Sequence, residues 1–307
     1  MRNEWRLHPY PAAYWDGQAW DWDRIVRIPT NPHQFYYYEA DLLISKALAD
    51  SMRVLELGCG TGGSTSIHVP EVARLLATDF SREMVLRAAT KFRRSRTRSL
   101  PEFAVADACR LPFRSSSFDA VISRGVLLSY VADPGDVLAE AHRVLRPEGR
   151  LAVDTMNRIR GSKPTVHRSL CLMNGSPMYV EFFVRAGRQV RLLFTLSSES
   201  PYASIARKGM RCERRPRDLL KYVVSEARYE ARLFRPEELR EMATAAGFHD
   251  VQITPLGHLA YTLGWKDKRL KRLASANRRW LSQLTLKLSD HLRPETALHL
   301  FVTASRG

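Results

Sequence analysis

Apolar residues along this chain occur in short continuous runs, and several of these runs end in a glycine or an acid. The first run, residues 54–57, carries one glutamate and leads directly into the glycine-rich segment 58–63. The next two runs end at Asp79 and at Asp107. Continuous apolar runs of this length are typical of parallel strands, because both faces of such strands are covered. The pattern predicts three parallel strands whose carboxyl ends share one crevice.

The remaining periodicity predicts an alternation of strands and helices. Further strands are expected at 118–123, 150–155, 250–254 and 298–303, and helices at 34–49, 82–92 and 133–145. Ser81 suits the N-cap of the second of these helices, and Asp133 followed by Pro134 suits the start of the third. This alternation predicts one large α/β domain with insertions.

Three stretches depart from the alternation. Residues 1–33 are rich in Trp, Tyr and Pro and are expected to form an irregular aromatic arm. Two β-rich runs, 179–185 and 189–195, flank a turn that contains Gly187, which predicts a hairpin. The expected domains are therefore the arm at 1–33, a core at 34–155 and 232–307 that carries a basic helical insertion at 258–293, and a second insertion at 156–231.

The glycines of segment 58–63 have a direct physical use. Gly58, Gly60 and Gly62 lack a Cβ atom, so they can adopt positive φ and let a ligand lie against the backbone. Asp79 follows at about the distance at which nucleotide-binding folds place an acid that accepts hydrogen bonds from ribose hydroxyls. A glycine-rich turn alone also closes many ordinary strand-to-helix connections, so the acid gives the pattern its significance.

Five motifs in order resemble those of class I S-adenosylmethionine-dependent methyltransferases, of the kind grouped as methyltransferase types 11 and 25. They are E-L-G-C-G-T-G at 56–62, A-T-D-F-S at 77–81, A-D-A at 106–108 with L-P-F at 111–113, F-D-A-V-I at 118–122 and R-V-L-R-P-E-G at 143–149. The resemblance implies a doubly wound, Rossmann-like α/β sheet of seven strands, six parallel and the last antiparallel. It also implies that the insertion at 156–231 is a β-rich lid, similar to the one by which glycine N-methyltransferase-like enzymes choose their acceptor.

The same resemblance implies S-adenosylmethionine as the cofactor and S-adenosylhomocysteine as the product. The residues that it assigns are Glu56, Gly58 and Gly60 at the methionine end, Asp79 at the ribose diol, Asp107 and the Ala108 amide at the adenine edge, and around them Cys59, Gly62, Phe80, Met84, Arg124 and Tyr38. Ordinary core packing is the alternative for Met84 and for each tyrosine of 36–38.

The sequence assigns no catalytic residue. Methyl transfer from a sulfonium mainly requires that nucleophile, methyl and sulfur lie on one line, so a missing signature is not decisive. Many relatives carry a histidine shortly after the fourth strand, where this chain has Leu128, Ser129 and Tyr130. The candidates are Arg124, Tyr130, Tyr179, His167 and His258. Arg124 offers either its backbone alone or a guanidinium that pairs with an acceptor carboxylate. An acceptor that is already ionised would need no general base.

The chain has 307 residues and a formal net charge of +16, which suggests an anionic partner or substrate. We expect a small-molecule or peptide acceptor, with a carboxylate as one form of it. Arginine-rich stretches near 82–98, 207–217 and 266–279 keep an RNA methyltransferase open as an alternative. A non-catalytic scaffold that binds S-adenosylmethionine is a third alternative.

Cysteine spacing and hydropathy bear on metal, redox compartment and membrane. The four cysteines, at 59, 109, 171 and 212, form no C-x-x-C pair, which predicts no metal site and a reduced, cytoplasmic location. The first 22 residues have no apolar segment typical of a secretory signal. No run has the length that spans a bilayer, so a membrane is not expected as a partner. A homo-oligomer is compatible with the sequence.

Overall fold

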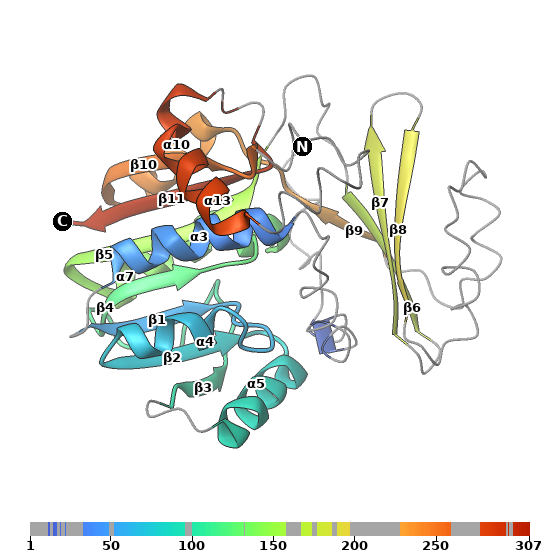
Figure 1. The fold of residues 1–307 in the computed structure, drawn as a ribbon. Coiled ribbons are helices and arrows are strands. Elements are labelled where there is room, and N and C mark those ends of the chain that lie inside the picture. Colours follow the sequence, from blue (N-terminus) through green and yellow to red (C-terminus); the bar gives the residue numbers. More distant parts are fainter. Residues whose placement is uncertain are drawn as a thin grey trace.

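The described residues of the computed structural model are 12, 15, 16, 19, 22, 33–48, 52–95, 100–131, 133–157, 167–173, 177–185, 189–196, 228–258, 277–292, 294 and 297–307. In the strands between 167 and 231, the description is of the backbone. These residues form a large mixed sheet, a smaller antiparallel sheet and helices (Figure 1).

The large sheet has seven strands in the order β10-β11-β5-β4-β1-β2-β3. Its strands are β1 (Arg53–Leu57), β2 (Arg74–Asp79), β3 (Glu102–Val105), β4 (Phe118–Ser123), β5 (Leu145–Met156), β10 (Phe248–Leu256) and β11 (His299–Arg306). β11 is antiparallel to both of its neighbours, and the pairs that join β3, β2, β1, β4 and β5 are all parallel. The predicted doubly wound α/β sheet, six strands parallel and the last antiparallel, is confirmed.

Helices cover both faces of this sheet. They are α3 (His33–Ala47), α4 (Thr65–His68), η1 (Val69–Glu71), α5 (Arg82–Arg94), α6 (Leu127–Tyr130), α7 (Pro134–Val144), α10 (Pro236–Ala245), α13 (Arg278–Lys287) and η2 (Ser289–His291). One apolar core includes side chains of α7 and α10, and a second includes side chains of α3 and α5. α13 contacts α3 and contributes Leu286 to the second core, and Figure 1 shows the two helices together.

Two predicted helix starts have the expected hydrogen bonds. Ser81 Oγ accepts from Met84 N at 3.1 Å at the start of α5. Asp133 Oδ1 accepts from Gly135 N at 2.8 Å, and Pro134 occupies the first turn of α7. Each side chain satisfies an amide that has no partner within its own helix, which fixes where the helix begins.

β5 begins earlier than the apolar run predicts, at Leu145 instead of near residue 150. Leu145 pairs with Phe118, and the register then shifts before Arg150 pairs with Ala120. Between them, Glu148 has a φ of 62°. Residues 145–149 therefore form an irregular first part of β5. They are mostly polar, so a pattern of continuous apolar residues does not predict them as strand.

The smaller sheet lies within the predicted insertion at 156–231 and has the order β8-β7-β6-β9. Its strands are β6 (His167–Met173), β7 (Pro177–Arg185), β8 (Gln189–Leu196) and β9 (Arg228–Ala231). β7 and β8 pair antiparallel from Met178↔Leu196 to Arg185↔Gln189, so the predicted hairpin is confirmed. The function of this sheet as a lid stays a prediction. The basic residues at 207–217 and 266–272 lie outside the described residues.

Glu39 ties α3 to the turn after β10. Its side chain is buried, and Oε2 accepts from Gly257 N at 2.7 Å. Oε1 has no hydrogen-bond partner in the described structure. Burial raises the pKa of Glu39 to about 8, while the Gly257 hydrogen bond acts in the opposite direction. The carboxyl group is therefore mainly protonated at pH 7.

This buried acid predicts a pH dependence of stability that Glu39→Gln removes. Because the folded-state pKa lies above the unfolded value, protonation contributes stability at low pH that is lost as the pH rises through about 8. Between pH 6 and pH 9, the wild type should lose about 2–3 kcal/mol more of its free energy of unfolding than the variant does. Urea unfolding of both proteins measures this difference. Parallel pH profiles would contradict the assignment.

Candidate active site

The glycine loop begins where β1 ends. Gly58, Gly60 and Gly62 have φ values of 67°, 54° and 80°, in the left-handed region that the sequence predicts for them. Cys59 N donates to Thr78 O at 2.9 Å, which ties the loop to β2. A Cβ atom on Gly62 would lie 3.0 Å from Phe92 Cε2, so this glycine also lets α5 approach the loop.

Asp79 joins the loop to the start of α5. Its Oδ2 accepts from Gly60 N at 2.8 Å and its Oδ1 accepts from Ser81 N at 2.9 Å. Burial raises the pKa of Asp79 to about 6, although both amide hydrogen bonds act against this rise, and the neighbouring Asp16 carboxylate adds to it. Each carboxylate oxygen can accept a second hydrogen bond, so Asp79 can hold the loop and also accept from a ligand hydroxyl.

Asp107 lies one strand further along the same edge. Its Oδ1 accepts from Cys109 N at 2.9 Å, and Arg110 N donates to Asp107 O at 3.0 Å, so the residue closes a turn after β3. Ala106 N donates to Asp79 O at 3.0 Å, which links this turn to the end of β2. Ala108 is buried within the turn. The two predicted acids thus lie at the ends of adjacent parallel strands.

Glu56 is buried on β1, just before the loop. Its Oε2 accepts from Thr65 Oγ1 at 2.5 Å, which fixes the first residue of α4. Its Oε1 has no hydrogen-bond partner in the described structure. Burial raises the pKa of Glu56, and the Thr65 hydrogen bond opposes this rise. A buried carboxyl oxygen without a partner is costly, so this atom is available to a polar group of a bound ligand.

Arg124 follows β4 and makes an ion pair with α3. Its Nη1 lies 2.8 Å from Asp41 Oδ2, and both side chains are nearly buried. The guanidinium carbon lies 4.8 Å from the centroid of the Tyr37 ring. A Cβ atom on Gly63 would lie 3.3 Å from Arg124 Nη2, so that nitrogen is close to the glycine loop. The guanidinium therefore bridges α3 and the loop.

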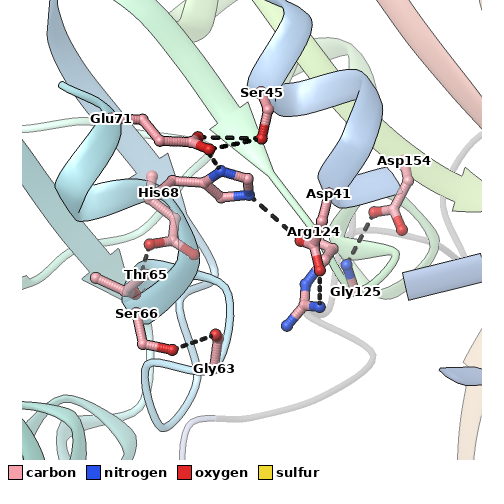
Figure 2. Close-up of polar contacts among 11 residues, drawn as sticks. Asp41, Ser45, Gly63, Thr65, Ser66, His68, Glu71, Arg124, Gly125 and Asp154 are labelled. Atoms are coloured by element: carbon pink, nitrogen blue, oxygen red, sulfur yellow. Dashed lines mark hydrogen bonds and ion pairs between the residues drawn. The ribbon is translucent and has the colours of Figure 1, made fainter. Parts of the chain in front are cut away.

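The ion pair continues into a chain of polar contacts (Figure 2). Asp41 Oδ1 lies 3.3 Å from His68 Nε2, and His68 Nδ1 lies 2.9 Å from Glu71 Oε2. Ser45 Oγ donates to Glu71 Oε1 at 3.0 Å. Burial alone would favour neutral His68, but its hydrogen bonds with Asp41 and Glu71 raise the pKa of the imidazole. The chain fixes α3 against α4 and η1.

Asp154 fixes the turn after β4 from the neighbouring strand. Its Oδ1 accepts from Gly125 N at 2.9 Å and from Val126 N at 2.8 Å. Gly125 and Val126 both have positive φ, of 114° and 64°. Burial raises the pKa of Asp154 to about 7, against the effect of the two amide hydrogen bonds. The strained turn that carries Arg124 therefore depends on this acid.

The described residues of the N-terminal arm lie against the same site. Asp16 Oδ1 accepts from Ser81 Oγ at 2.5 Å and from Glu83 N at 3.1 Å, at the start of α5. A Cβ atom on Gly60 would lie 3.3 Å from Trp22 Nε1. The Trp15 ring lies 5.9 Å from Trp22 and 5.4 Å from Tyr130, between centroids and nearly perpendicular to both. The arm thus contacts α5, the glycine loop and α6.

The other predicted residues are distributed between this site and the core. Met84 is buried in the first turn of α5, and its contact with adenine stays a prediction. Tyr36 is also buried and stacks on His299 at 3.6 Å between ring centroids, whereas Tyr38 and Phe80 are half-buried. Cys59 is buried, and burial raises the pKa of its thiol.

Three further catalytic candidates are His258, His167 and Tyr179. His258 is buried just after β10, and burial lowers the pKa of its imidazole. His167 and Tyr179 belong to β6 and β7, for which the backbone is described.

Among the described residues, no cluster of three or more His, Cys, Asp or Glu side chains suits a metal ion. No helix among these residues has the length and apolarity to cross a membrane.

Sequence reasoning missed Asp41, His68, Asp154 and Asp16. Asp41 and Arg124 are 83 residues apart, and Asp41 occurs within a helix without a motif around it. Asp16 lies in an arm that has no regular periodicity. No local spacing marks Asp41, Asp154 or Asp16, because each acts through a contact that only the fold creates, whereas His68 has the i,i+3 spacing to Glu71.

Comparison with known proteins identifies the domain. Residues 55–153 match the family model of the methyltransferase domain. The chain is 35% identical over 143 residues to demethylmenaquinone methyltransferase of Thermobifida fusca, over 46% of this chain and 59% of that protein. It is 35% identical over 119 residues to phosphatidylethanolamine N-methyltransferase of Cereibacter sphaeroides, over 38% of this chain and 58% of that protein.

A solved structure extends the likeness in fold. An S-adenosylmethionine-dependent methyltransferase of Clostridium acetobutylicum superposes with a TM-score of 0.51 at 15% identity, over 89% of this chain and 92% of that chain. The chain spans less than two thirds of the length of the two curated relatives above. The matched residues run from within β1 to within β5 and include the glycine loop and both acids, so this part of the chain is a methyltransferase domain, with the fold of S-adenosylmethionine-dependent methyltransferases.

Proposed function

We propose that this chain transfers the methyl group of S-adenosylmethionine to a small-molecule acceptor. The observation that carries the proposal is the position of Asp79, which holds Gly60 N and Ser81 N at the carboxyl edge of the sheet and has acceptor capacity left for a ribose diol. The methyltransferase domain match over 55–153 supports the same cofactor. The cofactor supplies an activated methyl group, so the protein has to bind and align it.

The described residues fit such a cofactor in charge and hydrogen-bonding capacity. Asp79 would accept from the ribose hydroxyls, and the turn at Asp107 and Ala108 would contact the adenine edge. Glu56 Oε1, buried and without a partner in the described structure, would accept from the amino group of the methionine end. Arg124 Nη2, close to Gly63, would pair with the methionine carboxylate. This assignment gives Arg124 to the cofactor in place of the acceptor.

The acceptor in this proposal is already ionised or needs little help to lose a proton. Arg124 is paired with Asp41, so it is not suited to remove a proton from the acceptor, and the side chain of His258 is buried away from an acceptor. A carboxylate acceptor fits the net charge of +16. The names of two relatives suggest a quinone or an aminophospholipid as alternatives.

RNA methylation is the second candidate function, and the charge of α5 is its support. Arg82, Arg87, Lys91, Arg93 and Arg94 all lie on this helix. Lys91 Nζ donates to Thr61 O at 2.6 Å, so one of these cations holds the glycine loop. Salt-sensitive binding of transfer RNA would favour this function, whereas tight cofactor binding without transfer to any acceptor would favour a scaffold.

The acceptor class is tested with labelled S-adenosylmethionine and three matched panels: carboxylates, phenols with quinols, and primary amines. We expect label in the carboxylate panel, with little change in rate between pH 6.5 and 8.5, since no acceptor proton is removed in that range. Methylation restricted to amines would contradict an ionised acceptor. The same incubation with transfer RNA and with membrane lipids tests whether RNA or a lipid is the acceptor.

Asp79 predicts how cofactor affinity depends on pH. Its carboxylate accepts from a ribose hydroxyl, and it becomes protonated as the pH falls through a pKa of about 6. The affinity of the wild type for S-adenosylhomocysteine should therefore fall between pH 7.5 and pH 5, by up to about tenfold per pH unit below 6. At pH 7.5, Asp79→Asn should bind about tenfold or more weakly, and its affinity should change little with pH. Calorimetry measures both, and equal pH slopes would contradict the role.

The role of Arg124 is tested with two ligands that differ at the methionine end. Arg124→Lys should weaken binding of S-adenosylhomocysteine by about tenfold to a hundredfold, because an ammonium group cannot reach Asp41 and the methionine carboxylate at once as the guanidinium does. It should leave binding of 5′-methylthioadenosine unchanged, since that ligand has no carboxylate. Asp41→Asn should have the same selectivity with a smaller effect, because Asp41 only orients the guanidinium. An equal loss for both ligands would assign Arg124 to the fold instead.

A further inference from the structure

α13 exposes apolar side chains on one line along its surface. Trp280, Leu284 and Leu288 are 62%, 38% and 43% exposed. They are spaced four residues apart, so they lie above one another on the same helix face. Leu288 is the residue that caps the helix, so the line runs along the whole of α13. We call these three residues the apolar line.

The opposite face of α13 is buried and carries small hydroxyl side chains. Ser282, Thr285 and Ser289 are all buried. Thr285 Oγ1 donates to Leu281 O and Ser289 Oγ donates to Leu286 O, both at 2.8 Å, so these two hydroxyls are satisfied locally, whereas Ser282 Oγ has no partner in the described structure. Small side chains let α13 lie close to α3, which it contacts. A surface helix ordinarily buries its large apolar residues, whereas α13 packs Leu286 against the core and leaves Trp280, Leu284 and Leu288 exposed.

Cations border the apolar line. Arg279, Gln283 and Lys287 are exposed and form a second line of the same spacing, one residue before the first. α13 contains no acid. The whole chain has a net charge of +16. The surface of α13 therefore combines a large aromatic, two leucines and fixed positive charge.

We propose that the apolar line of α13 docks on the surface of an anionic lipid bilayer. Trp and Leu can enter the boundary between headgroups and acyl chains, while Arg279 and Lys287 remain among the lipid phosphates. The sequence indicates no membrane-spanning run, but a helix that lies in the interface does not need one.

Size and charge favour a bilayer over a protein surface. The line from residue 280 to 288 is about 12 Å long. Three side chains over this length cover much less area than the roughly 800 Å² that each partner of a stable protein interface buries. A second copy of this chain would bring another +16 against it. Few apolar side chains with added cations suit a weak, reversible contact with anionic lipid.

The docking helix is connected to the candidate active site through α3. α13 contacts α3, and α3 carries Asp41, the partner of Arg124. The chain that follows η2 returns to the carboxyl end of β5, where Asn157 Nδ2 donates to Pro294 O at 2.6 Å and to Ala297 O at 2.9 Å. Docking is independent of the proposed function, because it requires neither cofactor nor methyl transfer.

The experiment is sedimentation of the full chain with phosphatidylcholine vesicles that contain either no phosphatidylglycerol or about 30% of it. We expect binding to the anionic vesicles that weakens as salt rises. Trp280→Ser with Leu284→Ser should reduce the ratio of bound to free protein at least tenfold. Arg279→Ser with Lys287→Ser should also reduce it and should flatten the salt dependence.

The matched control is Ile67→Ser with Leu86→Ser, which removes two apolar side chains of similar exposure, 41% and 39%, from α4 and α5. This control should bind vesicles as the wild type does. Circular dichroism on every variant reports on folding, and calorimetry with S-adenosylhomocysteine reports separately on the proposed function. The proposal is overturned if the wild type does not prefer anionic vesicles, if the α13 variant binds like the wild type, or if that variant converts a dimer into a monomer.

Discussion

The arrangement of the site depends on one carboxylate that accepts two backbone hydrogen bonds. Asp79 ends β2, yet its two oxygens hold Gly60 N in the loop after β1 and Ser81 N before α5. The left-handed glycines of the loop have little intrinsic preference for their conformation, so an external acceptor has to select it. The same side chain then sets the entry to α5, and its partial burial is the reason that its pKa rises. The shape of the glycine loop, the position of α5 and the pKa of Asp79 therefore all depend on the same side chain.

The polar groups behind this loop are more numerous than a structural role requires. Glu56 Oε1, Asp154 Oδ2 and Arg124 Nε are buried and lack a partner in the described structure. Each such atom costs about 1–3 kcal/mol if it stays unpaired. All three belong to residues at or beside the carboxyl ends of β1, β4 and β5. Their concentration at this edge is typical of a site whose hydrogen bonds are completed by a ligand.

The sequence was sufficient for the parts of the fold that repeat a local rule. The apolar runs and caps predict β1, β2, β4, α5 and α7, because burial on both faces and capping leave a pattern within a few residues. The order of the motifs predicts the seven-stranded sheet. The entry to β5 was placed wrongly, since its pairing with Phe118 involves polar residues and a register shift. Position along the chain also gave Asp79 and Asp107 correctly as neighbours at one edge.

Contacts between distant segments left no such signature. Nothing around Asp41 indicates that it meets Arg124, and the pair exists only because α3 packs on the sheet in the same core as β4. The inverted face of α13 was equally hidden, since its spacing of Trp280, Leu284 and Leu288 would read as a buried stripe in any ordinary helix. Which face points inward depends on how α13 packs against α3, and no pattern within the helix shows it.

The position of β11 has a consequence for the order in which the sheet assembles. β11 lies between β5 and β10 and is the only strand that pairs with β10 in the described structure. It is nevertheless encoded after β10, with α13 between them. During synthesis, β10 therefore has an open edge and no partner until the chain through residue 306 has been made. A ribosome that pauses in α13 would expose a nine-residue strand, which makes translation speed over this short region a determinant of aggregation.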